Sequence, residues 1–298
     1  MTVFDSSMIG IFDSGYGGLT ILGQIRKVLP EYDYLYLGDN ARAPYGTRSF
    51  DCIYHYTLDA VRYMFSQGCT LIILACNTAS AKALRTIQQH DLPLINQTSN
   101  IKHQTSKQVN VLGVIRPTVE VVPSITRTGH VGILATPATV SSESYVLELD
   151  KIASTIYGRS LIVTQQPCPM WVPLIEAGEH NSDGAKYFIR KYLQELLARD
   201  PMIDTLLLGC THYPLIQPAI DAELASLGHP CKTIAQGEIV ARSLADYLKR
   251  HPEYETQLQK SGSCRYLTTD DAERFSSAAT LFLGNTVQAE RIELTVNQ

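Results

Sequence analysis

Short apolar runs alternate with longer amphipathic stretches along most of this 298-residue chain. A parallel strand covered on both faces has a nearly continuous apolar sequence, and the crossover to the next strand usually forms a helix. Two successive series of such runs predict parallel sheets covered by helices. The first series comprises residues 8–12, 33–38, 70–75 and 92–96, and the second comprises residues 110–115, 130–135, 161–166 and 204–209.

Two amphipathic stretches give the clearest helix predictions. Within residues 183–199, apolar side chains recur at helical spacing, which indicates a helix with one face on a core. Residues 238–250 follow a turn expected at Gln236-Gly237, and we expect this second helix to return the chain to the first domain. The core face expected for the helix at 183–199 consists of Tyr187, Phe188, Tyr192, Leu193, Leu196 and Leu197.

The length of the chain allows two domains, each with its own core. The segment 97–109 is polar and aperiodic, which is typical of a boundary. We therefore expect a first α/β domain over residues 1–100, completed by about 237–298, and a second α/β domain over residues 101–236.

Composition excludes several classes of protein. The chain is 45% hydrophobic and 18% charged, which is typical of a soluble enzyme or binding protein. A net charge of -4 argues against a nucleic-acid partner. No apolar stretch approaches the roughly 18 residues of a membrane helix. The first apolar run also lacks the preceding basic region of a signal peptide, so we do not expect a signal peptide. Seven cysteines without a CxxC pair fit a reducing compartment, so we expect a cytoplasmic protein.

Two cysteines stand in matched settings, Cys76 in LIILACNTASA and Cys210 in TLLLGCTHYPL. Each follows an apolar run and a small residue, and each precedes a segment able to start a helix. A thiol at the carboxyl end of a parallel strand faces the crevice in which α/β proteins bind ligands. A buried Cys is most often a small core residue, but the repeated setting favours chemistry. The remaining cysteines lack this setting and are interpreted as structural: Cys52, Cys69, Cys168, Cys231 and Cys264.

The residues around the two thiols strengthen this interpretation. Asn77 and Thr78 can begin a helix whose N–H groups face the Cys76 thiol. His212 lies two positions after Cys210, and a nearby imidazolium favours a thiolate. Asp13 ends the first apolar run, so its carboxylate is expected in the same crevice as Cys76, although a helix N-cap is the alternative.

Three further segments are candidates for ligand contacts. The glycines of DSGYGGL allow a close backbone approach, but their spacing is not a full dinucleotide fingerprint. The turn Pro44-Tyr45-Gly46 can present backbone groups to a polar ligand, or it is an ordinary turn. Glu176 lies in an apolar stretch and needs a partner if it is buried, for which His212 is suitable; a surface position is the alternative.

In order and spacing, these segments resemble glutamate racemase, of the aspartate/glutamate racemase superfamily, over almost the whole chain. The resemblance rests on FDSGYGGL, GDNARAPYGTRS, LACNTASA, ATPATVSSESY, CPMWVPLIEAGE and LGCTHYPLI. It implies two similar flavodoxin-like or Rossmann-like α/β domains with the active site in the cleft between them. It also implies a cofactor-independent isomerase that interconverts L- and D-glutamate and supplies D-glutamate for bacterial peptidoglycan.

The resemblance also assigns roles to residues. Cys76 and Cys210 become the catalytic pair, with Cys76 serving D-glutamate and Cys210 serving L-glutamate. Asp13 and His212 support them, Glu176 lies beside His212, and no metal ligand is implied. A homodimer is expected, and binding to DNA gyrase occurs in some members. The implied substrate-binding positions are Asp13, Ser14, Pro44, Tyr45, Gly46, Asn77, Thr78, Thr136, Thr139, Thr211 and His212.

Two positions depart from the family pattern, and three alternatives remain open. Tyr16 replaces a small aliphatic residue and could crowd the cleft entrance, and Gln236 stands in AQGEIVA where a DSGEAVA-like sequence is typical. The first alternative is a related aspartate or hydantoin racemase, or an arylmalonate decarboxylase with one working cysteine. The second is a zinc site, and the third is a protein that acts chiefly by binding gyrase. The four residues that could surround zinc are Asp13, Cys76, Cys210 and His212.

Overall fold

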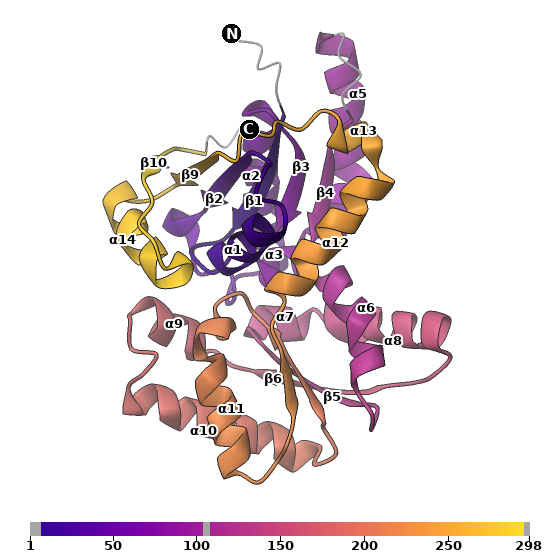
Figure 1. Ribbon diagram of the computed structural model, residues 1–298, viewed down its shortest axis with the longest axis vertical. Helices are drawn as coiled ribbons and strands as arrows, with labels where there is room; N and C mark the ends of the chain where they lie inside the picture. The colour runs from indigo at the N-terminus through magenta and orange to yellow at the C-terminus, as the bar shows by residue number, and fades with distance from the viewer. Residues whose placement is uncertain (1–6, 104–107, 295–298) are drawn as a thin grey trace.

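The computed structural model describes residues 7–103 and 108–294, which fold into two lobes, each built on a parallel sheet (Figure 1). The expected α/β class with two parallel-sheet domains is confirmed. Figure 1 draws the first lobe above the second.

The first lobe holds a six-stranded sheet in the order β10-β9-β2-β1-β3-β4, in which every neighbouring pair is parallel. Its three central strands are buried throughout, as their unbroken apolar sequences predict. The strands are β1 (Met8–Asp13), β2 (Tyr34–Gly38), β3 (Cys69–Leu74), β4 (Asn110–Gly113), β9 (Cys264–Thr268) and β10 (Ala289–Arg291).

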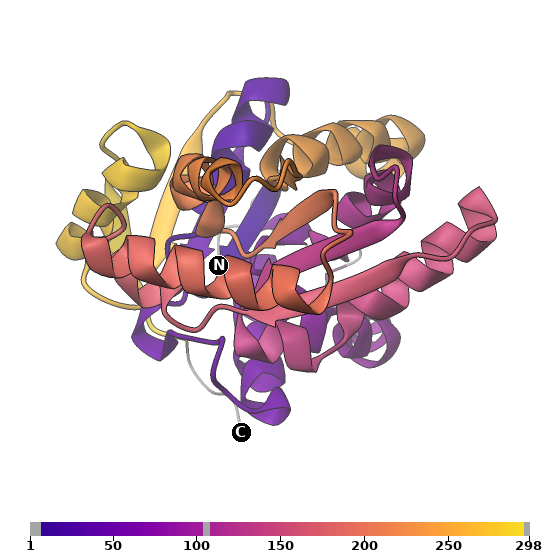
Figure 2. The ribbon, with the colours of Figure 1, turned by 90° about the horizontal axis from the view of Figure 1, so that it is seen from below.

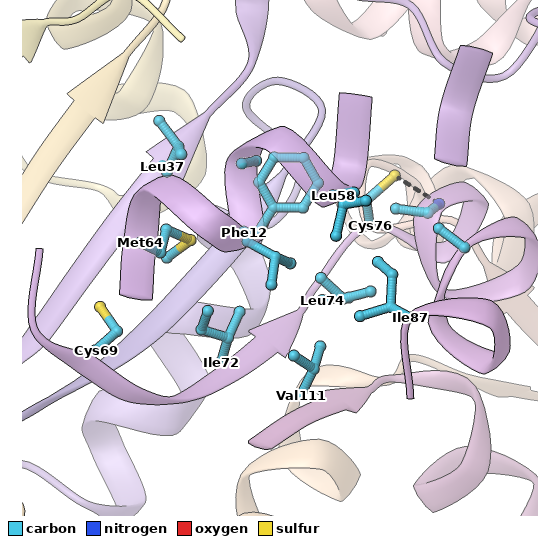
Figure 3. Close-up of a cluster of buried hydrophobic side chains, with 14 of the residues drawn as sticks. Phe12, Leu37, Leu58, Met64, Cys69, Ile72, Leu74, Cys76, Ile87 and Val111 are labelled. Carbon is cyan, nitrogen blue, oxygen red and sulfur yellow. Dashed lines mark hydrogen bonds between the residues drawn. The ribbon is translucent and has the colours of Figure 1, made fainter. Parts of the chain in front are cut away.

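Helices cover both faces of this sheet because alternate side chains of a strand point to opposite faces. Ile9 and Ile11 of β1 pack against α1, α12 and α14. Phe12 faces the other side, where Leu58 and Met64 of α2 complete the core (Figure 3). The helical segments of this lobe are α1 (Leu19–Val28), η1 (Asn40–Arg42), α2 (Phe50–Ser66), α3 (Asn77–Lys82), α4 (Leu84–Thr86), η2 (Ile87–Asp91), α5 (Leu92–His103), α12 (Gly237–Arg250), α13 (Pro252–Glu255) and α14 (Ala272–Leu283).

The second lobe holds a four-stranded parallel sheet in the order β6-β5-β7-β8. Helices α9, α10 and α11 cover one face, and α6 and α8 cover the other; Figure 2 shows α10 running along the outside of the lobe. The strands are β5 (His130–Ala135), β6 (Ile162–Pro167), β7 (Thr205–Gly209) and β8 (Lys232–Ile234). The helical segments are α6 (Ile115–Ile125), α7 (Pro137–Ser141), α8 (Ser144–Tyr157), α9 (Trp171–Glu176), α10 (Asp183–Arg199), η3 (Tyr213–Ile216) and α11 (Gln217–Ser226).

The chain passes between the lobes twice. It leaves the first sheet after Gly113 and enters α6 of the second lobe through Val114. It returns from β8 through Ala235 and Gln236 into α12, which packs on α1. The helix predicted at 238–250 therefore does bring the chain back to the first lobe. Among the described helices, none has the length and apolar sequence needed to cross a membrane.

The strand predicted at residues 92–96 is wrong, because this segment begins α5. Leu92 and Ile95, which are three positions apart, both pack against the first core, whereas Leu94 is 62% exposed. A spacing of three residues is typical of a helix. However, a short apolar run has the same sequence pattern in a buried strand and in a buried helix, so the sequence alone does not distinguish them.

The sequence predicts that the run at 110–115 is the first strand of the second sheet. This prediction is wrong. Residues 110–113 form β4, which pairs in parallel with β3 at the edge of the first sheet. The chain therefore still belongs to the first lobe at residues 108–113. We propose domain boundaries at the two crossings, Val114 and Ala235-Gln236, which would assign residues 108–113 to the first domain.

The helix predicted at 183–199 is confirmed as α10, but its buried face differs slightly from the prediction. Ile189, Tyr192, Leu193 and Leu196 form the buried stripe, with spacings of three and four. Tyr187 lies two positions before Ile189, which turns it away from that stripe, and it is 60% exposed.

Candidate active site

The carboxyl ends of both sheets meet at the interface between the lobes, and the candidate residues follow the strand ends there. Asp13 ends β1, and Cys76 lies two residues beyond β3 in the first lobe. Thr136 and Cys210 directly follow β5 and β7 in the second lobe. This edge is where open parallel sheets bind ligands.

Cys76 is a buried thiol at the first turn of α3. Its sulfur accepts a hydrogen bond from the Ala79 backbone N–H at 3.5 Å (Figure 3) and lies 3.4 Å from the Ser14 hydroxyl. Burial and the nearby Asp13 carboxyl raise the pKa of Cys76 to about 12, although the contacts from Ser14 and Ala79 lower it. At neutral pH, Cys76 is therefore a protonated thiol.

Cys210 belongs to a chain of three groups in the second lobe. Its sulfur lies 3.8 Å from Nδ1 of His212, and Nε2 of the same ring lies 2.9 Å from Oε1 of Glu176. Burial opposes a charge on His212, but the contacts with Cys210 and Glu176 outweigh it and raise the pKa of His212 to about 10. The protonated imidazole of His212 therefore lies directly beside the sulfur of Cys210.

The two thiols come from different lobes and interact across the interface. Cys210 is close enough to Cys76 to contribute electrostatically to the raised pKa of that thiol. Both side chains are buried, with 5% and 6% of their surface exposed. One thiol is thus protonated and the other lies beside a cation, which is the pairing that an acid and a base require.

Asp13 has one carboxylate oxygen engaged and one free. Its Oδ2 accepts the Gly15 backbone N–H at 2.9 Å, while Oδ1 has no hydrogen-bond partner among the described residues. Burial raises the pKa of Asp13, whereas the neighbouring His212 opposes that rise. A buried carboxylate oxygen without a donor is costly, so this position suits a ligand that brings a positively charged N–H group.

Three threonine hydroxyls gather where the lobes touch. Thr78 Oγ1, from the first lobe, lies 3.0 Å from Thr136 Oγ1 and 3.3 Å from Thr139 Oγ1. Thr136 also caps α7, since its hydroxyl accepts the Thr139 backbone N–H. Hydroxyls both donate and accept, so this cluster can bind a carboxylate.

Glycines allow the lobes to approach closely at two points. A Cβ atom on Gly17 would lie 2.3 Å from Thr211 Oγ1 and 2.4 Å from His212 Nδ1. On the other side, a Cβ atom on Gly46 would lie 3.0 Å from Cβ of Thr136. The glycine-rich turn after β1 therefore serves to bring Asp13 up to the His212 side of the cleft.

Most of the predicted site residues lie together in this interface. In the turn Pro44-Tyr45-Gly46, the carbonyl of Gly46 accepts the Ala138 N–H at 3.0 Å, whereas the Tyr45 hydroxyl donates to Asp39 at 2.5 Å and the ring is buried in the core. The residues brought together around the two thiols are Asp13, Ser14, Gly46, Asn77, Thr78, Thr136, Thr139, Glu176, Thr211 and His212.

An aromatic group that the sequence did not reveal borders His212. The Phe282 ring, from α14, stands edge-on to His212 with centroids 5.6 Å apart. Tyr16 stacks on Phe282 at 6.1 Å and also contacts Phe275. Tyr16 thus packs against α14, and its position in the turn places it beside the linked side chains of Cys210, His212 and Glu176. The apolar residues at 280–283 were the only signal for Phe282.

Two residues near the thiols were not among the predicted ligands: Gln236, at the second crossing, and Tyr145, in α8. Gln236 and Tyr145 both hydrogen-bond to the side chain of Asn77. As for a metal, the described residues hold no group of three or more His, Cys, Asp or Glu side chains arranged to bind one.

Comparisons with known proteins agree with this geometry. The model of the Asp/Glu/Hydantoin racemase family matches residues 20–244. The chain is 39% identical to a glutamate racemase of Paracoccus denitrificans over 292 residues, which cover 95% of this chain and 98% of that protein. It is 34% identical to one of Persephonella marina over 288 residues, 96% and 97% of the two chains.

Solved structures show the same relationship. A glutamate racemase isoform from Bacillus anthracis superposes with a TM-score of 0.81 at 29% identity, over 97% of this chain and 98% of the other. The enzyme from Francisella tularensis, solved in complex with D-glutamate, has a TM-score of 0.80 at 31% identity, over 98% and 99% of the two chains.

Proposed function

This chain belongs to the Asp/Glu/hydantoin racemase family, and we propose that it racemises glutamate by a two-base reaction between Cys76 and Cys210. It is an amino-acid racemase, an isomerase that interconverts L- and D-glutamate and thereby supplies D-glutamate for peptidoglycan synthesis. One observation carries the proposed mechanism. The protonated thiol of Cys76 lies on one lobe, and Cys210 lies beside the His212 imidazolium on the other.

In the direction from L- to D-glutamate, Cys210 acts as the base. Its thiolate takes the α-proton, and the electron pair of the broken C–H bond remains on the α-carbon and its carboxylate. Cys76 then breaks its S–H bond and delivers that proton to the opposite face. The reaction ends with a Cys210 thiol and a Cys76 thiolate, which is the state that accepts D-glutamate.

Three features support a substrate position between the thiols. The free Oδ1 of Asp13 pairs with the α-ammonium group. The threonine cluster of Thr78, Thr136 and Thr139 binds a carboxylate through its hydroxyls. The lobes lie so close at Gly17 and Gly46 that a Cβ atom would contact the opposite lobe, and hydrogen bonds in a site that excludes water stabilise developing charge more strongly than they would in water.

The raised pKa of Cys76 gives the two directions different requirements. A thiol with a pKa of about 12 is a ready proton donor, as the L-to-D direction needs. For the reverse direction it must lose its proton. The Asp13 carboxyl opposes that loss, and an ammonium group bound at Asp13 offsets the opposition, so substrate binding itself prepares Cys76 as a base.

The experiment that tests the function is circular dichroism of L-glutamate incubated with the purified protein and EDTA, without added cofactor. We expect loss of the optical signal, abolished by Cys76→Ser and by Cys210→Ser. Folded protein that leaves L-glutamate unchanged would overturn the glutamate assignment, and aspartate and malonate derivatives would then be tested. Activity lost only with EDTA would instead favour the zinc alternative.

The partners and location belong to the same proposal. A homodimer and binding to DNA gyrase rest on the resemblance alone, and light scattering and a gyrase supercoiling assay test them. A cytoplasmic location is supported by the state of the cysteines, all seven of which are free.

A further inference from the structure

Gln236 occupies the second crossing between the lobes, directly before α12, and is 98% buried, since only 2% of its surface is exposed. A buried carboxamide must have its donors and acceptors satisfied. Its Nε2 lies 3.3 Å from the Val114 carbonyl, 3.0 Å from Thr118 Oγ1 and 2.8 Å from the Tyr145 hydroxyl. Its Oε1 accepts a hydrogen bond from Asn77 Nδ2 at 2.7 Å.

The orientation of Gln236 follows from the backbone of the other crossing. The carbonyl of Val114 can only accept a hydrogen bond, so the amide nitrogen of Gln236 must face it. The carbonyl oxygen of Gln236 then faces Asn77, which must present its own amide nitrogen in return. The two crossings of the chain, at Val114 and Gln236, are therefore joined through one side chain.

Tyr145 closes the network into a ring. Its hydroxyl receives a hydrogen bond from Gln236 and donates one to Asn77 Oδ1 at 2.5 Å. Each of the three side chains thus gives one hydrogen bond to the next and receives one from the other. Asn77 comes from the first lobe, Tyr145 from the second and Gln236 from the crossing, so the ring forms only when the lobes have this relative placement.

The ring uses only one of the two hydrogens on Asn77 Nδ2. Asn77 directly follows Cys76, at the start of α3, and both oxygen and nitrogen of its carboxamide are fixed by the ring. The second N–H is left in a fixed direction. Without Gln236 and Tyr145, the carboxamide could turn about its terminal torsion and exchange its oxygen and nitrogen.

We propose that Gln236 is a positioning residue, which closes this ring with Tyr145 and thereby holds the carboxamide of Asn77 so that its remaining N–H binds glutamate. The proposal rests on the proposed function, because it assumes that Asn77 contacts the substrate. It assigns a role to a position at which the family resemblance is broken. Asn77 would bind both L- and D-glutamate. Loss of its orientation should therefore weaken the binding of both enantiomers more than it slows the chemical step.

The test compares glutamate kinetics of Gln236→Leu with those of Tyr145→Phe in the full-length protein. Losing the hydrogen bond from Asn77 to glutamate is expected to raise KM about tenfold for both enantiomers, with kcat changed no more than about threefold. Because both variants open the same ring, the double variant should raise KM no further than either single variant does. A purely structural role would lower kcat in proportion to the folded fraction and leave KM unchanged.

Gln217→Leu is the matched control. Gln217 donates to Thr233 at 2.9 Å in the second lobe and has no part in the ring, so its variant should keep the KM of the parent protein. An unchanged KM in folded Gln236→Leu overturns the proposal, and so do KM increases that multiply in the double variant. If Gln236→Leu does not fold, Tyr145→Phe alone decides, since it removes a single hydroxyl. Failure of the parent protein to racemise glutamate overturns the proposed function instead.

Discussion

Nε2 of His212 lies 2.9 Å from Oε1 of Glu176, while the other ring nitrogen of His212 faces the sulfur of Cys210. Glu176 has no direct contact with that sulfur among the interactions of the described residues. It acts through the imidazole, whose protonated form it stabilises.

We therefore expect the pH dependence of L-to-D racemisation to report on Glu176. Burial lowers the pKa of His212, but Cys210 and Glu176 raise it to about 10, so the imidazolium is present below that pH and is lost as the pH rises through it. Glu176→Gln removes one of the raising contacts, and the high-pH fall in kcat/KM should move to lower pH. Rates measured from pH 6 to about 11 test this. Glu179→Gln, an exposed neighbour, is the control, and an unmoved fall in Glu176→Gln would contradict the prediction.

The two thiols should have separable effects on proton exchange. In Cys76→Ser, Cys210 can still remove the α-proton of L-glutamate and return one to the same face, but the opposite face lacks its donor. We expect this variant to exchange the α-proton of L-glutamate for deuterium in D₂O without inversion, and Cys210→Ser to do so with D-glutamate. Proton NMR measures exchange, and circular dichroism measures inversion. Equal exchange of both enantiomers by either variant would point to one-base chemistry.

The sequence predicted the strands that carry the site better than the strands at the edges of the sheets. The central strands β1, β2, β3, β5 and β7 are apolar because they are buried on both faces, and each was expected within about one residue. Strands β8 and β10 have three residues each and mostly exposed or half-exposed positions. Such short segments carry no periodic signal, so these two strands were not predicted. Strand β9 was not predicted either.

The candidate site divides in the same way. Cys76, Cys210 and His212 were found because strand ends and cysteines are visible in a sequence. In the sequence, Gln236 is only a departure from the family pattern, and Tyr145 is only the last residue of ATPATVSSESY, with no role indicated. Their meeting at Asn77 depends on how the two crossings of the chain lie against each other. That relation is set by tertiary packing, which local patterns do not encode.

Gly17 should tolerate no side chain. A Cβ atom there would overlap Thr211 Oγ1 and the His212 ring, so Gly17→Ala must push the turn away from the second lobe. A displacement of about 1 Å between reacting groups can cost on the order of 100-fold in rate, and we expect kcat/KM to fall by that order.

Gly23→Ala supplies the control for this prediction. Gly23 lies within α1, where a Cβ atom would meet only Leu283 Cδ2 at 3.6 Å. Alanine there should leave racemisation unchanged and stabilise the helix by up to about 1 kcal/mol. Steady-state kinetics and thermal unfolding of both variants make the comparison. Gly17→Ala with the kinetics of the parent protein would show that the turn is not in close contact with His212.

Asp13→Asn tests where the substrate ammonium binds. The asparagine oxygen can keep the hydrogen bond from the Gly15 N–H, but its NH₂ group then replaces the free oxygen and turns a donor toward the ammonium group. A hydrogen bond to a charged group contributes roughly 1.5–3 kcal/mol, so KM for both enantiomers should rise about 10- to 100-fold.

Asp33→Asn is the matched control, because Asp33 is equally buried but lies at the opposite end of the first sheet, where its Oδ1 accepts from Ser261 and Ser263. Asp33→Asn should lower the unfolding temperature and leave KM unchanged. If KM rises equally in both variants, the change reflects a general loosening of the first lobe, and the ammonium group binds elsewhere than at Asp13.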